Sequence, residues 1–115
     1  MGWLVYGNRN TYQFDDRTLA HLQIVIGLKL RRREGFFFSW DEPVEAGSGR
    51  TSIWIEPRIP LEFRYSRNRP AAISREWLQA LTELSNSAGG LRLVEEVPQD
   101  QIATIDIEAP PPPGG

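Results

Sequence analysis

A run of cationic side chains followed by aromatic ones is the segment of the sequence with the most evident chemical potential. Lys29, Arg31, Arg32 and Arg33 precede an aromatic stretch at 36–40. Because cations bind phosphate groups and rings stack on bases, the pattern is compatible with DNA or RNA binding. It is also typical of a helix whose C-terminal cations offset the helix dipole and which leads into a buried strand. The dipole needs fewer cations than are present, so the surplus of arginines leaves a binding role open.

A second candidate site combines Phe37, Trp54 and Arg64, each in a segment that alternates as a strand does. Alternation places Phe37 and Trp54 on the face away from the main core, and we expect Arg64 on that face too. Two rings and an arginine on one sheet face would form a platform for stacking bases. The alternative is that a helix, the C-terminal tail or a second subunit covers this face, since aromatic side chains are commonly buried. The candidate binding residues are Arg31, Arg32, Arg33, Phe37, Trp54 and Arg64.

Residue types that support catalysis or metal binding are sparse. The single histidine, His21, has no carboxylate at helical spacing, which favours a packed or surface role. Adjacent acids at 15–16, 41–42 and 95–96 are better explained as a helix cap and as loop or tail charge, because hard cations need oxygens that converge from several places. The sequence contains no phosphate-binding loop and no cysteine. It therefore predicts no catalytic residue, no metal and no cofactor.

The hydrophobic pattern predicts an α+β domain with the element order ββαβββαβ. The expected sheet is mostly antiparallel, with a hairpin at the N-terminus and a three-stranded meander after the first helix. We expect both helices to lie mainly on one face of this sheet. The predicted strands are 3–7, 11–14, 34–40, 50–56, 61–65 and 91–96, and the predicted helices are 16–33 and 73–87.

The first predicted helix, 16–33, has apolar residues on nearly every side. Asp15 or Asp16 is expected to cap its N-terminus. A helix of this kind is buried on more than one side, so its outer face needs the second helix or another subunit. One predicted partner is therefore a second copy of the chain, in a homo-oligomer that forms through helix 16–33.

Length and charge separate a main body from a C-terminal tail. The 115 residues fit one domain, expected at 1–97, followed by an acidic tail rich in Pro and Gly at 98–115. We expect this tail to be disordered or polyproline, with a short strand at 101–108 as an alternative for that part. All 13 Lys and Arg residues precede residue 95, whereas five of the 15 Asp and Glu residues lie at or after it. The tail could therefore screen a basic surface, or it could simply be solvated.

No segment of the sequence is apolar enough to span a membrane. The longest wholly apolar run, 24–28, is far shorter than the roughly 20 residues that a span needs. The N-terminus has neither a basic start nor a small-residue cleavage site, so we expect no signal peptide. Together with the absence of cysteine, these features predict a cytoplasmic protein without a membrane partner.

The sequence contains the segments "MGWLVYG", "FDDRTLAHLQIVI", "KLRRREGFFFSW", "GRTSIWIEP", "PLEFRY" and "EWLQAL…NSAGGLRLV". Together these segments resemble a family of small proteins from actinobacteria and their phages. Members of that family are often labelled ATP-dependent DNA ligase or described as a domain of unknown function. The resemblance covers roughly residues 1–95.

The ligase label can be tested on one residue type. A nucleotidyl-transferring ligase forms its AMP adduct on the lysine of a Lys-x-Asp-Gly motif. The only lysine here, Lys29, is followed by Leu30, Arg31 and Arg32, so the motif is missing. The resemblance therefore assigns no catalytic residue to this sequence. It still implies that the domain accompanies DNA-processing systems. We therefore expect a small non-catalytic interaction module; the alternative is a nucleic-acid-binding accessory protein in DNA processing.

Overall fold

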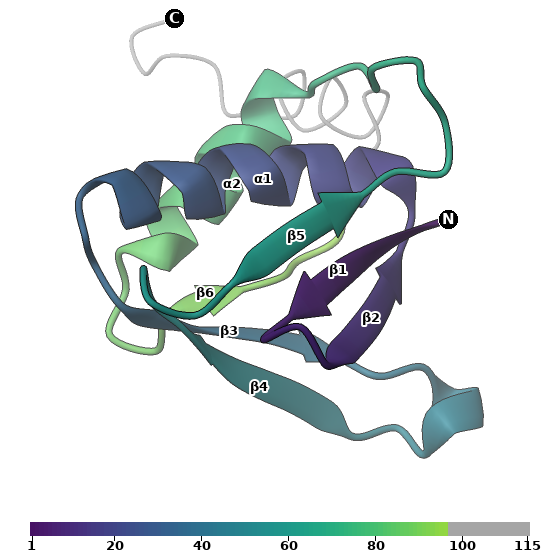
Figure 1. The fold of residues 1–115 in the computed structure, drawn as a ribbon, viewed down its shortest axis with the longest axis horizontal. Coiled ribbons are helices and arrows are strands. Elements are labelled where there is room, and N and C mark those ends of the chain that lie inside the picture. Colours follow the sequence, from purple (N-terminus) through teal and green to yellow (C-terminus); the bar gives the residue numbers. More distant parts are fainter. Residues whose placement is uncertain (97–115) are drawn as a thin grey trace, which may run out of the picture.

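Six strands form two three-stranded sheets in the computed structural model, which describes residues 1–96 of the chain (Figure 1). In the first sheet, β1 (Gly2–Tyr6) lies between β2 (Asn10–Phe14) and β5 (Leu61–Arg64), and both pairings are antiparallel. The second sheet places β3 (Phe36–Asp41) between β4 and β6. Strand β4 (Arg50–Ile55) is antiparallel to β3, and the short β6 (Leu91–Arg92) is parallel to it.

Two helices pack beside each other against these sheets, as Figure 1 shows. They are α1 (Asp16–Arg31) and α2 (Arg75–Ser85), and a short 3₁₀ helix, η1 (Val44–Ala46), interrupts the connection between β3 and β4. The α+β class, the mostly antiparallel pairing and the order ββαβββαβ are thus confirmed. The strand predicted as an alternative at 101–108 and the tail at 98–115 lie outside the described residues.

The position of β5 differs from the prediction. We expected β5 to continue a meander with β3 and β4 in a single sheet, and this expectation is wrong, because β5 pairs with β1. The connection 57–60 contains Pro57 and Pro60, which lack the N–H needed to continue a ladder beside β4. Instead, the Pro60 carbonyl accepts a hydrogen bond from the Gly7 N–H at 2.9 Å, which starts the pairing with β1. The chain therefore leaves one sheet and enters the other.

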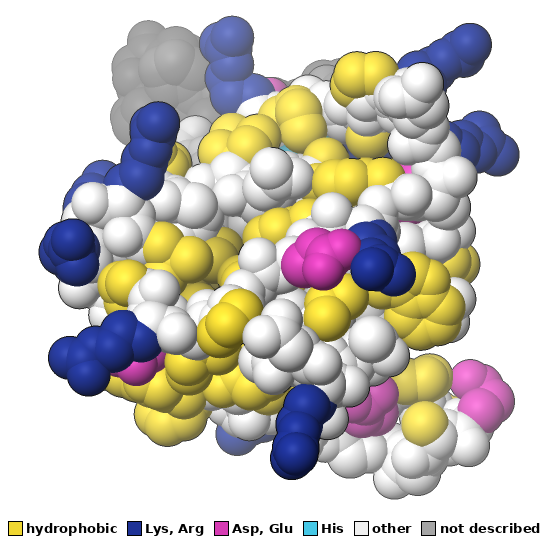
Figure 2. Space-filling view, in the orientation of Figure 1, with side chains coloured by type: hydrophobic (Ala, Val, Ile, Leu, Met, Phe, Trp, Pro, Cys, Tyr) yellow, Lys and Arg dark blue, Asp and Glu magenta, His cyan; other side chains and the backbone are white. Residues whose placement is uncertain are grey.

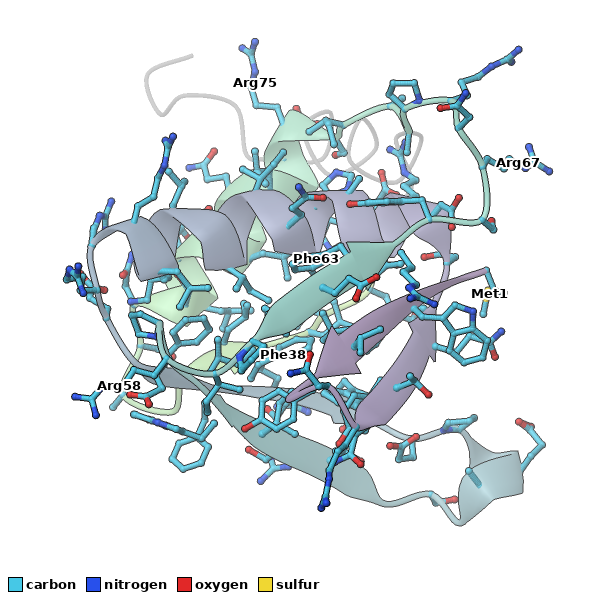
Figure 3. All side chains as sticks on the ribbon, viewed as in Figure 1. Met1, Phe38, Arg58, Phe63, Arg67 and Arg75 are labelled. Atoms are coloured by element: carbon cyan, nitrogen blue, oxygen red, sulfur yellow. The ribbon has the colours of Figure 1, made fainter. Side chains whose placement is uncertain are left out.

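An aromatic cluster joins the inner faces of the two sheets, and Figure 3 labels one of its members, Phe38. The ring of Phe14 on β2 lies 6.2 Å from that of Phe38 and 5.2 Å from that of Trp40, both on β3. The predicted inward face of β3 is confirmed, since Phe36 is buried with them. Helix α1 covers the cluster with its own buried side chains, each worth roughly 1.5–3 kcal/mol relative to exposure. These side chains are Leu19, Leu22, Val25 and Ile26.

The ends of α1 follow from specific hydrogen bonds. The Asp15 carboxylate caps the N-terminus by accepting a bond from the Thr18 N–H at 2.9 Å, as predicted. At the other end the predicted boundary, residue 33, is too late, because the helix stops at Arg31. Arg33 adopts a left-handed conformation, φ 59°, and its N–H bonds back to the Leu30 carbonyl. This is the αL residue of a Schellman ending, which cannot extend a right-handed helix.

Helix α2 begins as the sequence predicts, with Ser74 as its N-cap. The Ser74 side chain accepts a hydrogen bond from the Trp77 N–H at 3.2 Å.

Neither α1 nor any other helix within residues 1–96 is long and apolar enough to cross a membrane.

Candidate interaction surfaces

The three predicted arginines at the end of α1 differ from Lys29 in their environment. Arg31 is the last residue of α1, and Arg32 and Arg33 follow it in the turn, all three exposed. Lys29, by contrast, is buried, and its Nζ lies 2.8 Å from a Glu34 carboxylate oxygen. Its Nζ also donates to the Asn86 side-chain oxygen at 3.1 Å. The fold therefore accounts for Lys29, whereas the three arginines are available at the surface.

Phe37 and Trp54 form an exposed aromatic pair, as the alternation predicted. They are cross-strand neighbours on β3 and β4, with ring centroids 5.1 Å apart in a T-shaped arrangement. Phe37 is 51% exposed and Trp54 is 41% exposed. The indole lies against Gly35, where an added Cβ would come within 2.5 Å of Trp54 Cζ2. Glycine at this position thus makes room for the ring.

Arg64 does not join this pair. It lies on β5 in the other sheet, opposite Trp3, and its Nε contacts the Glu62 carboxylate at 2.5 Å. The predicted platform of two rings and this arginine is therefore not formed. The cause is the pairing of β5 with β1 rather than with β4.

Two arginines that the prediction left out do share the face of the aromatic pair. Alternation along β4 puts Arg50 on the same side as Trp54, and the parallel register puts Arg92 beside Ser39. Both arginines, together with Phe37, line a groove of about 420 Å³. We call this surface the sheet face. This grouping could hardly be predicted from the sequence, because the pairing of β3 with β6 joins segments far apart in the chain.

A second hollow, which we call the α1 groove, lies between α1 and the connection from β5 to α2. It has a volume of about 980 Å³. Its apolar lining includes Ile24, Leu28, Tyr65 and Ile73, each between 37% and 43% exposed. Figure 2 shows hydrophobic side chains at the surface in this region of the molecule. The outer side of helix 16–33, predicted to need a cover, is thus uncovered within residues 1–96.

Cationic residues border the α1 groove. Arg31 comes from α1, and Arg67 and Arg69 come from the connection that forms the opposite wall. All three are exposed, and Arg67 extends outward from the connection (Figure 3). Within residues 1–96 none of the three has a salt-bridge partner. The groove thus combines apolar surface with uncompensated positive charge.

Side-chain hydrogen bonds hold the two walls of the α1 groove together. Asp16, in the first turn of α1, accepts bonds from the Ser66 N–H at 3.1 Å, the Ser66 hydroxyl at 2.9 Å and the Arg67 N–H at 3.1 Å. These donors, the Ser66 N–H above all, lower the pKa of the Asp16 carboxyl below its ordinary value. The Tyr65 hydroxyl donates to the Gln23 side-chain oxygen at 2.5 Å. The connection is therefore fixed to α1 at several points.

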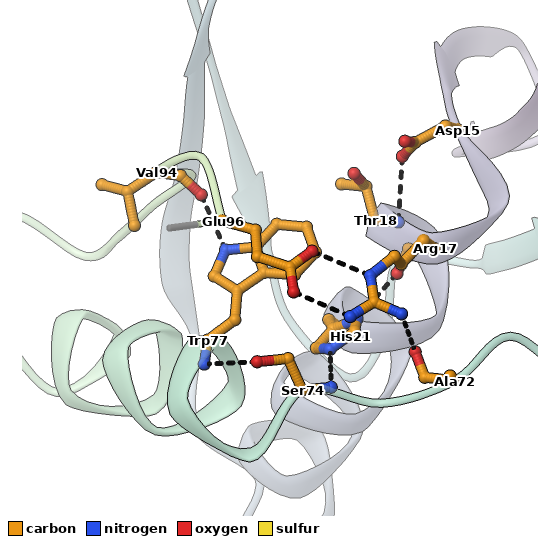
Figure 4. Close-up of polar contacts among 9 residues, drawn as sticks. All are labelled: Asp15, Arg17, Thr18, His21, Ala72, Ser74, Trp77, Val94 and Glu96. Atoms are coloured by element: carbon orange, nitrogen blue, oxygen red, sulfur yellow. Dashed lines mark hydrogen bonds and ion pairs between the residues drawn. The ribbon is translucent and has the colours of Figure 1, made fainter. Parts of the chain in front are cut away.

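A polar cluster beside the groove connects α1, the start of α2 and the end of the described chain (Figure 4). Arg17 donates to both Glu96 carboxylate oxygens, at 2.8 and 2.7 Å, and to the Ala72 carbonyl at 2.6 Å. This arginine lowers the pKa of Glu96, chiefly through the hydrogen bond. His21 is fully buried, with its Nε2 accepting from the Ser74 N–H at 2.8 Å and its Nδ1 bonded to the Arg17 carbonyl at 2.7 Å. The histidine therefore has the packed role that the sequence favoured.

The polar groups of the described residues do not converge as a metal site would require. Within residues 1–96, no group of three His, Asp or Glu side chains is close enough to hold a metal ion. Every buried side-chain nitrogen or oxygen in that part of the chain has a hydrogen-bond partner. The candidate binding sites among the described residues are therefore two surfaces, the α1 groove and the sheet face.

Comparisons with known proteins identify the family. No curated protein and no solved structure matches the chain. A family model matches residues 1–96, which is the whole of the described part and most of the chain. The chain therefore belongs to the family described as a domain of unknown function, DUF7882.

Proposed function

We propose that the chain is a non-catalytic interaction module whose α1 groove binds a partner segment that carries both apolar and acidic side chains. The observation that carries this proposal is an apolar groove bordered by three arginines without salt-bridge partners within residues 1–96. Contiguous exposed apolar surface is uncommon on soluble proteins and typically marks an interaction site.

The chemistry of the groove selects the partner. Covering Ile24, Leu28 and Ile73 removes apolar area from water, which favours association. The arginines favour an acidic segment, and arginine is enriched at protein interfaces. Asp16 and Tyr65 already fix the two walls of the groove relative to each other. Binding a partner therefore costs little additional conformational entropy in the chain.

A second copy of the chain is a less suitable occupant. A symmetric contact through α1, as predicted from helix 16–33, would bring the arginines that border one groove close to those of the other. Like charges at such a contact oppose association. We therefore favour an acidic partner over a homo-oligomer at this face, and light scattering that shows a dimer abolished by Leu28→Asp would reverse this preference.

Selection from a displayed random peptide library on the immobilised full chain tests the proposed function. We expect enriched peptides to combine Ile, Leu, Val or Phe with Asp or Glu. Counter-selection on the Leu28→Asp variant should remove them, because that variant places a carboxylate in the groove. Enrichment of basic peptides, or of peptides that survive the counter-selection, would contradict the proposal.

Nucleic-acid binding is a second candidate function, and the sheet face favours it. Phe37 and Trp54 offer exposed rings beside each other, and Arg50 and Arg92 lie on the same face. Rings and cations together suit single-stranded DNA or RNA. Labelled single-stranded oligonucleotides should then bind with an affinity that falls steeply with salt and is lost in Trp54→Ala. Binding that is unaffected by Trp54→Ala would remove the sheet face as the site.

A further inference from the structure

We infer that residues 97–115 of this chain occupy the α1 groove when no partner is bound. The inference rests on the proposed function, because it assumes that the groove accepts an acidic segment with apolar side chains. It adds a means of regulation: a partner must displace a ligand that the chain itself carries.

The composition of this segment matches the groove. It contains Ile102, Ile105 and Ile107 among its apolar residues and no Lys or Arg. Its acidic residues alternate with or flank these isoleucines, which suits a groove with an apolar lining and arginines at its border. The acidic residues are Asp100, Asp106 and Glu108.

The segment starts beside the groove. Glu96, the residue before it, is held by both of its carboxylate oxygens on Arg17. The same guanidinium donates to the Ala72 carbonyl, and both sequence neighbours of Ala72 line the groove. On α1, Arg17 precedes Ile24 by seven residues and Leu28 by eleven, which places all three along one side of the helix.

The length of the segment is sufficient. From Arg17 to Arg31 the helix rises about 21 Å at 1.5 Å per residue. An extended chain covers that distance with about seven residues, and the 19 residues from 97 to 115 could span roughly 60 Å. The isoleucines and acids at 100–108 are therefore within reach of the groove even if the chain first turns around the connection.

Attachment to the same chain makes even a weak contact effective. A short flexible linker gives a ligand an effective concentration on the order of millimolar. A segment with low intrinsic affinity would thus still fill the groove much of the time. An external partner would bind more tightly once the acids of the segment are replaced, as in the triple variant Asp100→Asn, Asp106→Asn, Glu108→Gln.

Paramagnetic labelling of the full chain tests the inference. The sequence has no cysteine, so Thr104→Cys provides a unique site for a nitroxide. In dilute samples we expect the backbone amide NMR signals of Ile24, Leu28 and Ile73 to lose most of their intensity. The effect should be lost in Leu28→Asp and weakened in Arg67→Ala/Arg69→Ala, but retained in Val44→Asp, a matched change at a side chain that is 78% exposed elsewhere.

Several results would overturn the inference. They are the absence of broadening at the α1 groove, broadening around Phe37 and Trp54 instead, and broadening that persists in Leu28→Asp. A mixture of isotope-labelled chain without nitroxide and nitroxide-labelled chain without isotope must show no broadening, since broadening there would mean that the segment binds a second copy. Peptide selection becomes an independent test when it is repeated on the triple variant Asp100→Asn, Asp106→Asn, Glu108→Gln, in which the acids of the competing segment are removed. Peptides selected without internal docking leave the proposed function intact, whereas docking in the wild type with no peptide selected even on the triple variant contradicts that function alone.

Discussion

Arg33 occupies a position where glycine is usually favoured. Its φ of 59° and the bond from the Glu34 N–H to the Lys29 carbonyl at 3.1 Å define the left-handed ending of α1. A side chain costs roughly 1–2 kcal/mol in this conformation, and glycine does not. An arginine at such a site, next to Arg31 and Arg32, is consistent with a requirement for its charge.

We therefore expect Arg33→Gly to raise the free energy of unfolding by about 1 kcal/mol, measured by urea denaturation. Arg31→Gly is the matched control, because it lies inside the last helical turn and should lower stability by about 1 kcal/mol. A loss of stability in Arg33→Gly would show that the arginine side chain stabilises the fold in a way that its contacts do not indicate.

Lys29 gives a second prediction at the residue scale. Its amine is buried and engaged by Glu34 and Asn86, and the sequence around it lacks the ligase motif. An amine held by these groups is not free to attack a phosphate. Incubation of the chain with labelled ATP should yield no AMP adduct, as judged by mass spectrometry. A covalent adduct on Lys29 would restore the ligase interpretation.

Single residues were predictable where a local rule decides their environment. The exposure of Phe37 and Trp54 follows from alternation, and the caps Asp15 and Ser74 follow from their chemistry at helix starts. The role of Arg92 was not predictable, because it depends on a parallel pairing with a strand about 50 residues away. The same holds for the burial of Lys29 against α2.

At the scale of elements, Asp16 determines the position of the connection that forms one wall of the α1 groove. Replacing it with alanine removes the acceptors of the Ser66 and Arg67 N–H groups. In Asp16→Ala we expect faster hydrogen exchange at these two amides and weaker binding of groove-selected peptides. Asp15→Ala is the control: it removes the helix cap at a cost of about 0.5–2 kcal/mol but leaves these bonds in place. Equal exchange at Ser66 and Arg67 in wild type and Asp16→Ala would contradict this role.

Acid should weaken the same region. Hydrogen bonds lower the pKa of Asp16 and Glu96 in the folded state relative to the unfolded chain. The unfolded state therefore binds protons more readily, so this stabilisation is present above the ordinary carboxyl pKa of about 4 and is lost as the pH falls through the lower folded values. The melting temperature should drop on acidification, and less so in Glu96→Gln. Glu45→Gln, at an exposed residue of η1, should behave like wild type; identical acid profiles for all three would refute the contribution of Glu96.

Among the elements, the helices and strands themselves could be predicted, but one strand partner could not. Periodicity gave the segment of β5 and the inner side of its Leu61 and Phe63. Its pairing with β1 depends on how Pro57 and Pro60 direct the chain between sheets, which a pattern of hydrophobic residues does not encode. Arg64 lies on β5, so the pairing of β5 with β1 also separates Arg64 from Phe37 and Trp54, with which it was predicted to form a platform.

At the scale of the whole molecule, residues 1–96 form a compact α+β core, and the apolar α1 groove on its surface is bordered by positive charge. The α+β class was predictable because local patterns sum to it. In the sequence, only the excess of apolar residues on helix 16–33 indicated the α1 groove. Its second wall is an irregular connection, 65–73, whose path follows from bonds to Asp16 and Gln23 rather than from any periodicity.

At this scale the charge distribution of the chain has a functional consequence. Positive side chains are confined to the part of the chain before residue 95, and the residues after 96 carry only negative ones. If the α1 groove selects acidic segments, the chain carries both the receptor surface and a competitor. Partner affinity should then depend on the charge of residues 97–115 as well as on the groove.

The most direct test of the α1 groove compares the affinity of a groove-selected, fluorescein-labelled peptide for the wild type, Leu28→Asp and Val44→Asp by anisotropy. Both substitutions place an acid at an exposed apolar position, so neither should disturb the core. We predict that Leu28→Asp weakens binding by roughly tenfold or more, equivalent to ~1.4 kcal/mol, and that Val44→Asp leaves it unchanged. Equal affinities for the two variants would contradict the assignment of the groove as the interaction surface.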